Sequence, residues 1–342
     1  MNKRKRTARR ERKAPRDLSL PLEALRWRVE DPAEDGARLD RFLMERLTWR
    51  SRSSIVHLLR EGKVSRNGEA VTRKAARVHL GDEVAVAVPP PAEEERHAEL
   101  GERLAAAVLY QDEHLIALAK PAGLVVHPVG RVRVNTLIQA LHWAFLHGPL
   151  RRAGRGPDRI PRICHRLDKD TSGVIVLALT LAARSRLQAA FDARDALEKD
   201  YFGVVVGAPE GDGGRVDLPL GRDEEAAVGL MMTSRPDGLP AATSWRVRAR
   251  GEGLTALGFR IHTGRQHQIR VHAAQGLGCP ILCDPLYGKG ERCWPAEEPV
   301  LRRQALHAER LAFDHPIGGE RVELRAPLPE DLRAVGERLV PG

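Results

Sequence analysis

Hydrophobic and polar residues follow a helical spacing in the first part of the chain. Between Ala37 and Val88, apolar residues recur at helical intervals in two stretches, Leu39–Leu47 and Ile55–Leu59. The pair Asn67-Gly68 then predicts a tight hairpin turn between short strands. The pattern therefore predicts a small α/β domain over residues 35–88.

After residue 104 the pattern changes to short β-like runs with occasional helices. It predicts strands over Leu115–Ala119, Gly173–Leu179, Tyr201–Val206 and Leu257–Ile261, and helices over Leu181–Ala193 and Gln266–Gln275. Strands outnumber helices and do not alternate regularly with them. The chain from 104 to 342 is thus expected to be a second domain with an α+β fold, not a doubly wound one.

Two segments lack the apolar content of a folded core. Residues 89–103 begin with three prolines and a run of glutamates, which predicts an interdomain linker. Residues 1–16 hold nine Lys and Arg against the single Glu11, so this tail supplies +8 of the net charge of +10. We expect residues 1–20 to be disordered, either as a solvated extension or as a basic arm that gathers RNA phosphates.

The cysteines and the apolar runs limit the cellular setting. The chain has four cysteines, too few for a disulfide scaffold, so a reducing cytoplasm is expected. Cys279, Cys283 and Cys293 could form a metal site, but without a CxxC pair buried core thiols are favoured. The longest apolar stretch, Gly173–Ala183, is too short to span a bilayer, and the basic start lacks the apolar segment of a secretory signal.

A dense polar cluster precedes the strand predicted at Gly173. The segment from His165 to Ser172 holds two carboxylates, two cations, an imidazole and two hydroxyls. Such a set at a strand end suits a reactive site. A charged loop whose Thr171 and Ser172 cap the next element would have the same composition. The residues alone leave both interpretations open.

A second polar cluster, Thr263–His272, follows the strand predicted at Leu257–Ile261 and opens the last predicted helix. On that helix, Gln266 and Arg270 would share a face. A guanidinium beside a carboxylate keeps it ionised at any physiological pH, so Arg270 could serve a reactive carboxylate. A purely structural ion pair is the alternative.

The two clusters together resemble the signature motifs of the RluA family of pseudouridine synthases, which convert uridine in RNA to its C-glycoside isomer. Further similar segments, spread over residues 105–335, are Leu118–Leu124, Lys199-Asp200-Tyr201, Gly278–Ile281, Asp284–Gly288 and Leu306-His307-Ala308. The first part of the chain resembles an S4 RNA-binding domain, at Arg38–Leu43, Ser51–Ser53, Gly62–Val64 and Asn67-Gly68. This module precedes the catalytic domain in family members that act on large ribosomal RNA.

The resemblance implies a fold and a set of active-site roles. The catalytic domain would have a mixed, mainly antiparallel central sheet with flanking helices. Asp168 would be the catalytic carboxylate and Arg270 the cation paired with it. Tyr201 would pack on the target uracil, and Arg166 would fill the stack that the flipped nucleotide vacates. The isomerisation involves no redox step, so neither a cofactor nor a metal is expected.

The same resemblance implies RNA contacts in both domains. They are expected at His165, Arg265 and His267 in the catalytic domain, and at Arg52, Lys63 and Arg66 in the S4 module. The segment Arg151–Arg162 carries five arginines against one aspartate and is either a loop that grips phosphates or a solvated insertion.

Three positions depart from the family pattern. Gln266 stands where threonine is usual, Cys164 where an apolar residue is common, and Cys283 where glycine is usual. None of them is the presumed catalytic carboxylate. The departures bear on the positioning of the substrate, and Cys283 suggests a locally altered backbone.

The expected function is isomerisation of specific uridines, in 23S ribosomal RNA because of the S4 module, by a monomer. Two alternatives remain from the residues: a non-catalytic S4-domain protein that binds RNA or assists ribosome assembly, and a synthase that acts on transfer RNA. The motifs of P-loop nucleotide triphosphatases are not met, since Cys283 and Gly290 replace the required Gly and Ser or Thr. Whether Asp168 attacks C1′ or removes a ribose proton is also open.

Overall fold

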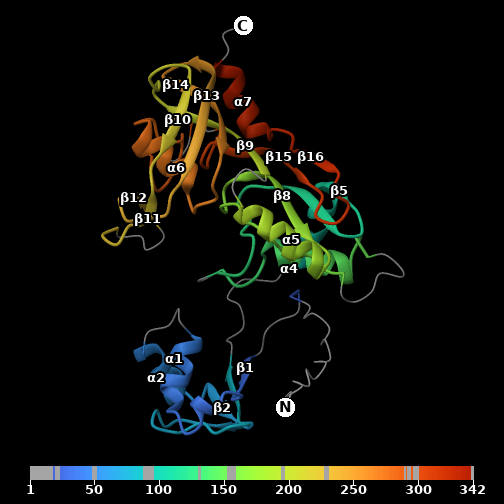
Figure 1. The fold of residues 1–342 in the computed structure, drawn as a ribbon, viewed down its shortest axis with the longest axis vertical. Coiled ribbons are helices and arrows are strands. Elements are labelled where there is room, and N and C mark those ends of the chain that lie inside the picture. The colour runs from blue at the N-terminus through green and yellow to red at the C-terminus, as the bar shows by residue number, and fades with distance from the viewer. Residues whose placement is uncertain are drawn as a thin grey trace, which may run out of the picture. The chain divides into compact units, whose positions relative to one another are not determined.

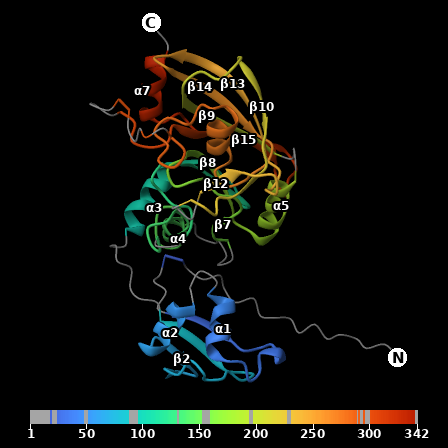
Figure 2. The ribbon, with the colours of Figure 1, turned by 90° about the vertical axis from the view of Figure 1, so that its left-hand side faces the viewer.

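The computed structural model divides into two compact units, one made mostly from residues before 96 and the other mostly from residues after it (Figures 1 and 2). The structure describes residues 18–19, 24–47, 52–87, 96–129, 132–151, 159–193, 197–226, 231–288, 290, 294–295 and 300–339. Nearly all of the basic tail and the centre of the 151–162 segment lie outside these ranges.

The smaller unit is a four-stranded antiparallel sheet packed against two helices. Its elements are β1 (Ala24–Arg28), η1 (Pro32–Glu34), α1 (Leu39–Arg46), α2 (Arg52–Arg60), β2 (Val64–Arg66), β3 (Glu69–Ala70) and β4 (Glu83–Ala87), and the sheet order is β1-β4-β2-β3. The core forms where Phe42 and Leu43 of α1 and Ile55 and Leu59 of α2 meet Val64. Strand β1 lies before the boundary predicted at residue 35.

The hairpin predicted at Asn67-Gly68 is confirmed. Asn67 has φ = 53° and Gly68 has φ = 87°, and β2 and β3 pair antiparallel on either side of them. Two consecutive residues with positive φ suit a tight turn between twisted strands, which explains an Asn-Gly pair at this point.

The larger unit is built on a ten-stranded sheet in the order β10-β13-β14-β9-β15-β8-β6-β5, with β16 on β15 and β7 on β8. Strands β15 and β8 are parallel, and the other neighbours described are antiparallel. The prediction of an α+β fold with a mixed, mainly antiparallel sheet is confirmed. The strands are β5 (Val108–Gln111), β6 (Leu115–Lys120), β7 (Arg162–Ile163), β8 (Ser172–Ala178), β9 (Leu197–Val206), β10 (Gly213–Asp217), β13 (Ala242–Gly251), β14 (Leu254–Ile261), β15 (Leu306–Asp314) and β16 (Arg321–Arg325).

Helices pack against this sheet, and a small hairpin of β11 (Leu220–Arg222) and β12 (Met232–Ser234) accompanies it. The helices are α3 (His97–Ala106), α4 (Leu137–Leu146), α5 (Leu181–Asp192), α6 (Gln268–Val271), the π-helical turn η2 (His272–Gly276) and α7 (Glu330–Leu339). Ala183 and Leu187 of α5 pack on Val174 and Val176 of β8. Figure 2 shows α3 and α4 side by side.

Helix α3 corrects the predicted linker, because it occupies much of 89–103. His97 and Leu104 of this helix are buried. Gly101 lets it approach α4 closely, since a Cβ at that position would lie 2.6 Å from the Trp143 ring. The helix was not predicted because only a narrow face of it is apolar and most of its other residues are polar. Residues 89–95 of the predicted linker lie outside the described ranges.

The helix predicted over residues 266–275 begins later than the sequence indicated. His267 has a left-handed backbone with φ = 55°, so the α-helical turn starts at Gln268 and continues as the π-helical turn η2. Gln266 therefore precedes the helix and does not share a helical face with Arg270. The positive φ of His267 and the π geometry of the five residues of η2 are invisible to a periodicity argument, which assumes one regular spacing.

Gly173 occupies the point where the parallel strands β8 and β15 meet. It has φ = 118°, and a Cβ added to it would lie 2.2 Å from the carbonyl oxygen of Ala308, its partner in the register. Only glycine combines this φ with such a close approach of two backbones. The strand that follows the first polar cluster is thereby fixed against β15.

We expect Gly173→Ala to destabilise the larger unit by about 3 kcal/mol or more, because the strained φ and the steric clash add. Gly336 in α7 has nothing within 4 Å of an added Cβ. Gly336→Ala is therefore a matched control that should stabilise the helix by roughly 0.5–1 kcal/mol. Urea unfolding of both variants measures the effect. An unchanged midpoint for Gly173→Ala would show that the junction tolerates a side chain.

Candidate functional site

Asp168 lies in the turn that leads into β8. The amide of Thr171 donates a hydrogen bond to the carbonyl oxygen of Asp168 at 3.2 Å, which closes the turn. The Asp168 side chain is 28% exposed, so its carboxylate lies at the surface of the fold and remains accessible. The first polar cluster of the sequence is thus a turn that presents a carboxylate at the start of a buried strand.

Arg270 joins the two polar clusters. Its Nη1 lies 3.2 Å from Oδ2 of Asp168. Its Nε and Nη2 lie 2.6 and 2.7 Å from the two carboxylate oxygens of Asp284, a bidentate pair whose side chains are 4% and 0% exposed. Burial disfavours the charged guanidinium, but the hydrogen bonds and charge of Asp284, with a smaller contribution from Asp168, outweigh it and raise the pKa of Arg270. One buried cation therefore serves two carboxylates.

Tyr201 lies close to the same carboxylate. It is on β9, directly opposite Phe259 of β14 in the register, and its ring packs against the buried core. Burial, followed by the negative charge of Asp168, raises the pKa of the Tyr201 phenol well above its ordinary value. The phenol is consequently neutral at physiological pH, and the site contains a flat apolar ring beside an anion.

A second ring completes the support of Arg270. The guanidinium carbon of Arg270 lies 5.1 Å from the centre of the Tyr287 ring, within the range of a cation–π contact. The Tyr287 hydroxyl accepts a hydrogen bond from the amide of Met232 and lies 2.8 Å from Nδ1 of His267. Burial lowers the pKa of His267, although the charge of Asp168 opposes the shift. His267 is therefore a mostly neutral imidazole close to the candidate carboxylate.

Lys120, at the end of β6, holds the other side of the turn. Its Nζ donates to the carbonyl oxygens of Pro121, Leu124 and Lys169 at 2.8 to 3.0 Å, and the residue is 1% exposed. Burial lowers the pKa of Lys120 to about 7, against the opposing charge of Asp170. Three carbonyl acceptors match the three donors of the ammonium form. This lysine links the segment after β6 to the turn that carries Asp168.

The structure gives His165 a different role from the RNA contact that was predicted. Its ring stacks on Phe191 of α5 at a centroid distance of 4.3 Å, and its Nε2 accepts the amide of Val176. Burial lowers the pKa of His165 to about 3, which agrees with an unprotonated acceptor nitrogen. One ring face and one nitrogen of the imidazole are thus engaged within the protein, so we do not retain His165 among the candidate RNA contacts.

The other predicted residues of the larger unit differ in how far they are engaged. Arg166 is exposed, and its charge contributes to lowering the pKa of His127, after burial, which is the larger cause. Arg265 is partly buried and its Nε donates to the carbonyl oxygen of Pro240. Arg166 therefore has the freer guanidinium of the two.

Of the three residues predicted in the S4-like unit, two are tied to carboxylates. Arg52 lies 3.4 Å from Asp40, whose buried carboxylate also accepts a bidentate pair from Arg38. Arg66 lies 3.9 Å from Asp82. Lys63 is exposed and has no side-chain partner among the residues that the structure describes. Lys63 is thus the residue of this set most available to a phosphate.

The sequence argument did not identify Asp284 or Lys120 as parts of the site. Asp284 also accepts the amides of Leu286 and Tyr287, the arrangement of an ordinary Asx turn before a proline. In a sequence, an aspartate that begins a turn before a proline cannot be told from an aspartate that also forms a buried ion pair. Cys283, just before it, has φ = 57°, the left-handed region that favours glycine, so the cysteine adopts a glycine-type backbone and the expected alteration is not shown.

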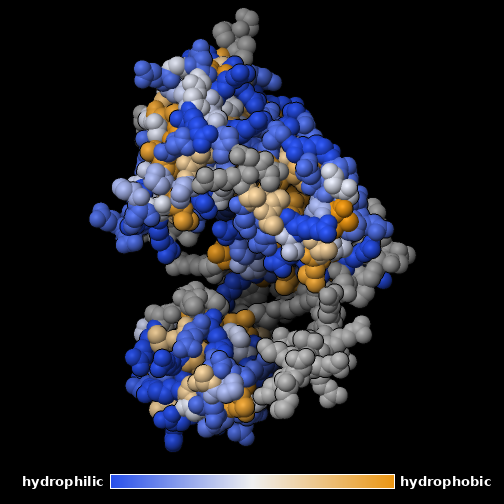
Figure 3. Space-filling model, viewed as in Figure 1, coloured by the Kyte–Doolittle hydropathy of each residue, from blue (hydrophilic) through white to orange (hydrophobic). Residues whose placement is uncertain are grey.

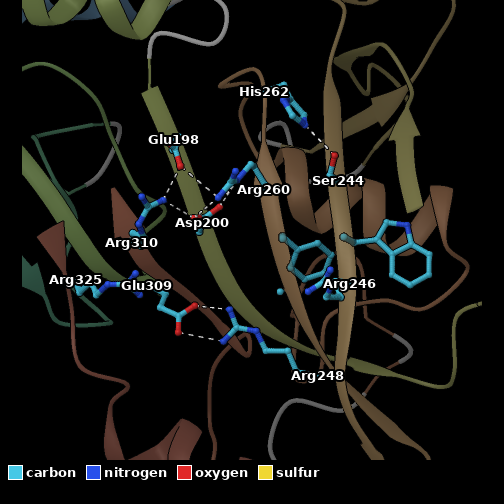
Figure 4. Close-up of a pocket in the computed structure, with 13 residues that line it drawn as sticks. Glu198, Asp200, Ser244, Arg246, Arg248, Arg260, His262, Glu309, Arg310 and Arg325 are labelled. Carbon is cyan, nitrogen blue, oxygen red and sulfur yellow. Dashed lines mark hydrogen bonds and ion pairs between the residues drawn. The ribbon is translucent and has the colours of Figure 1, made fainter. Parts of the chain in front are cut away.

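A concavity of about 930 Å³ lies on the other face of the sheet, away from Asp168. It is lined by Asp200, whose neighbour Tyr201 must point to the opposite face because side chains alternate along a strand. Figure 4 shows two of its ion pairs: Arg260 pairs with Asp200, and Arg248 pairs with Glu309. Five arginines and three carboxylates line the concavity, so ion pairs compensate only part of its positive charge. The two polar clusters of the sequence meet at Asp168 and Arg270 and not here, so we assign the chemistry to the Asp168 side.

The described residues contain no group of three or more His, Cys, Asp or Glu side chains arranged to hold a metal ion. Within the same part of the chain, none of the helices has the length and apolar character needed to cross a membrane. The face drawn in Figure 3 is mostly hydrophilic, with hydrophobic residues in small scattered groups.

Comparisons with known proteins agree with this geometry. The family model described as RNA pseudouridylate synthase matches residues 114–275, and the S4 domain model matches residues 37–84. The chain is 40% identical over 327 residues to the ribosomal large subunit pseudouridine synthase D of Xanthomonas campestris pv. campestris, covering 92% of this chain and 93% of the relative. It is 37% identical to the protein of the same name from Vibrio cholerae, covering 87% and 89%.

A solved structure of human RNA pseudouridylate synthase domain containing 4 has the same fold. It superposes with a TM-score of 0.56 and 26% identity, covering 71% of this chain and 97% of that chain. Asp168, Tyr201 and Arg270 all fall inside the matched segment 114–275, and Lys63 falls inside the S4 match. With more than a third of its residues identical to such relatives over most of its length, the chain belongs to the RNA pseudouridine synthase family.

Proposed function

We propose that this enzyme isomerises specific uridines to pseudouridine in large-subunit ribosomal RNA, with Asp168 as the reacting carboxylate. The observation that carries this proposal is the 3.2 Å ion pair between Asp168 and the buried Arg270, with the ring of Tyr201 beside it. An ionised carboxylate and a flat apolar ring at one accessible place match the two needs of the reaction, a group acting on the ribose and a surface for the base.

The reaction is an isomerisation of the substrate alone. The N1–C1′ bond breaks, the uracil turns, and a C5–C1′ bond forms; C5 then loses its proton and N1 gains one. Cleavage develops positive charge near C1′, which a carboxylate stabilises or traps, as in glycoside hydrolysis. Asp168 acts either as the nucleophile at C1′ or as the base for a ribose proton, and in both roles Arg270 supplies a positive charge 3.2 Å from the carboxylate.

The substrate base must leave its helix to reach this carboxylate. Flipping costs a few kcal/mol of lost stacking, and we assign to the exposed Arg166 the role of occupying the vacated position. Tyr201 then packs on the flipped uracil. His267 and Arg265, on the segment before α6, are the proposed contacts to the neighbouring nucleotides.

The choice of ribosomal RNA is supported by the S4 match and by the names of the relatives. We assign Lys63, Arg52 and Arg66 to phosphate contacts in the S4 unit, with Lys63 the least engaged within the protein. We further propose that the enzyme works in the cytoplasm as a monomer, since Asp168, Arg270 and Tyr201 all come from one chain.

Asp168→Asn keeps the size of the side chain but removes the reacting charge. We expect turnover to fall on the order of 10⁴-fold or more, with RNA affinity retained. Pseudouridine mapping and a filter-binding assay on the same ribosomal RNA fragment measure the two properties. A variant that still forms pseudouridine at the wild-type rate would contradict the assignment. Modification of transfer RNA and not of ribosomal RNA by the wild-type enzyme would overturn the proposed substrate.

Tyr201→Phe and Tyr201→Leu separate the ring from the hydroxyl. If the ring stacks on the flipped base, the Phe variant should keep turnover within a few-fold, whereas the Leu variant should lose roughly 10- to 100-fold in kcat/KM. Single-turnover rates with one uridine-containing stem-loop measure both variants. Equal losses in the two would point to the hydroxyl in place of the ring.

Lys63→Ala tests the phosphate contact of the S4 unit. The logarithm of RNA affinity falls with the logarithm of salt concentration, and one lost phosphate contact should reduce that slope by about 0.7 to 0.9. Arg26→Ala is a matched control, since Arg26 is an exposed arginine of the same unit that is already paired with Glu83 at 2.8 Å. If the two variants give the same slope as the wild type, Lys63 does not contact a phosphate.

A further inference from the structure

The segment from Arg303 to His307, which enters β15 at Leu306, contacts three consecutive residues of the turn and the strand that follows it. Arg303 donates to the carbonyl oxygen of Asp170, and Gln304 donates through Nε2 to the hydroxyl of Thr171. His307 lies 2.9 Å from the hydroxyl of Ser172 through its Nδ1. All three contacts join residues 133 or 135 positions apart. The segment therefore follows the turn residue by residue, from the position after Lys169 to the start of β8.

The guanidinium of Arg303 is almost fully enclosed and makes contacts on two sides. Its Nη1 lies 3.1 Å from the carbonyl oxygen of Asp170 and 3.2 Å from that of Leu306. Its Nε and Nη2 form a bidentate pair with Asp331, at 2.7 and 3.0 Å. The side chain of Arg303 is 9% exposed and that of Asp331 is 30% exposed. The arginine thus connects one backbone oxygen of the turn, that of Asp170, to a carboxylate on α7.

Asp331 fixes this arginine to the C-terminal helix. It lies in the first turn of α7, where its Oδ1 also accepts the amide of Leu332. Leu332, Val335 and Leu339 of the same helix belong to the buried core. Because α7 is anchored through these apolar residues, its carboxylate gives Arg303 a fixed partner. The guanidinium is planar, so once Asp331 binds its Nε and Nη2, the remaining nitrogen Nη1 points in a defined direction, toward the turn.

The consequence for the reaction follows from the closeness of the turn to the carboxylate. The carbonyl that Arg303 holds belongs to Asp170, two residues after Asp168, within the turn closed by the Thr171 amide. A displacement of about 1 Å of a reacting group can cost about 100-fold in rate. On the other side, Lys120 holds the carbonyl of Lys169. The turn is therefore held by two cations that bind its backbone and not its carboxylates.

We propose that Arg303 is a positioning residue for the reaction, and that Asp331 of α7 acts through it to fix the direction in which Asp168 faces the ribose. The proposal rests on Asp168 being the reacting carboxylate. It gives the C-terminal helix, which lies outside the segment matched by the synthase family model, a part in catalysis. The arginine contacts the backbone of the turn and does not touch the substrate.

Arg303→Gln and Asp331→Asn test this proposal, with Arg248→Gln as a matched control. Arg248 is also held by one carboxylate through two nitrogens (Figure 4), but its partner Glu309 lines the concavity of about 930 Å³ and not the turn that carries Asp168. Single-turnover rate and KM are measured per folded molecule, well below the unfolding midpoint of each variant. We expect kcat to fall roughly 10- to 100-fold for Arg303→Gln and about 3- to 10-fold for Asp331→Asn, with KM within about 2-fold. The control should keep its kcat.

Three outcomes would overturn the proposal: wild-type kcat in folded Arg303→Gln, an equal loss in Arg248→Gln, or a loss confined to thermal stability. If Arg303→Gln does not fold, Asp331→Asn decides alone, because its carboxylate is more exposed and its loss leaves α7 anchored by apolar residues. In the double variant, kcat should equal that of Arg303→Gln, whereas additive losses would show that Asp331 does not act through Arg303. A wild-type enzyme without activity on any RNA would overturn the proposed function and this inference with it, whereas an active wild-type enzyme with an unchanged kcat in Arg303→Gln would overturn the inference alone.

Discussion

The arrangement of the site depends on the buried ion pair between Arg270 and Asp284. Because Asp284 is fully enclosed and takes two of the guanidinium nitrogens, the charge of Arg270 is compensated inside the fold. Breaking a buried pair of this kind leaves an uncompensated charge, so the pair is costly to disturb. Asp168, partly exposed and bonded through one longer contact, is therefore an additional anion and not the main counter-charge. This leaves its carboxylate available to a ligand while the guanidinium remains 3.2 Å from it.

The backbone around Asp168 is constrained by a different kind of interaction. Lys120 and Arg303 bind carbonyl oxygens of the turn, and Gly173 brings the following strand against the backbone of Ala308. These contacts fix where the turn lies without placing a second cation on the carboxylate of Asp168. A fixed turn and an available carboxylate are both needed for attack on a defined atom, since orientation contributes only when the reacting group stays free. The fold thus separates the groups that hold the turn from the group that holds the charge.

How far the sequence predicts this molecule depends on the kind of feature. The four predicted strands and the helix after Thr180 agree with β6, β8, β9, β14 and α5 within a few residues, because buried strands and a capped amphipathic helix leave continuous patterns. The pairing of Asp168 with Arg270 was predicted through the motifs. The contact of Arg303 with Asp170 could not be predicted from the sequence. Arg303 binds a backbone carbonyl oxygen, which every residue type has, so the contact leaves no pattern in the sequence. The late start of α6 was missed because His267 adopts a left-handed backbone that no periodicity reveals.

The distribution of charge also bears on how RNA meets the enzyme. Without its tail the chain is nearly neutral, and on the concave face opposite Asp168 Arg248, Arg260 and Arg310 are paired with carboxylates. Paired arginines release few counterions from RNA, so these three contribute little to affinity. Arg166 and Lys63, for which no side-chain partner lies among the described residues, are better placed to do so. In the larger unit, the positive charge of Arg166 near Asp168, against arginines on the opposite face that are mostly paired, favours one orientation of a bound RNA over the reverse.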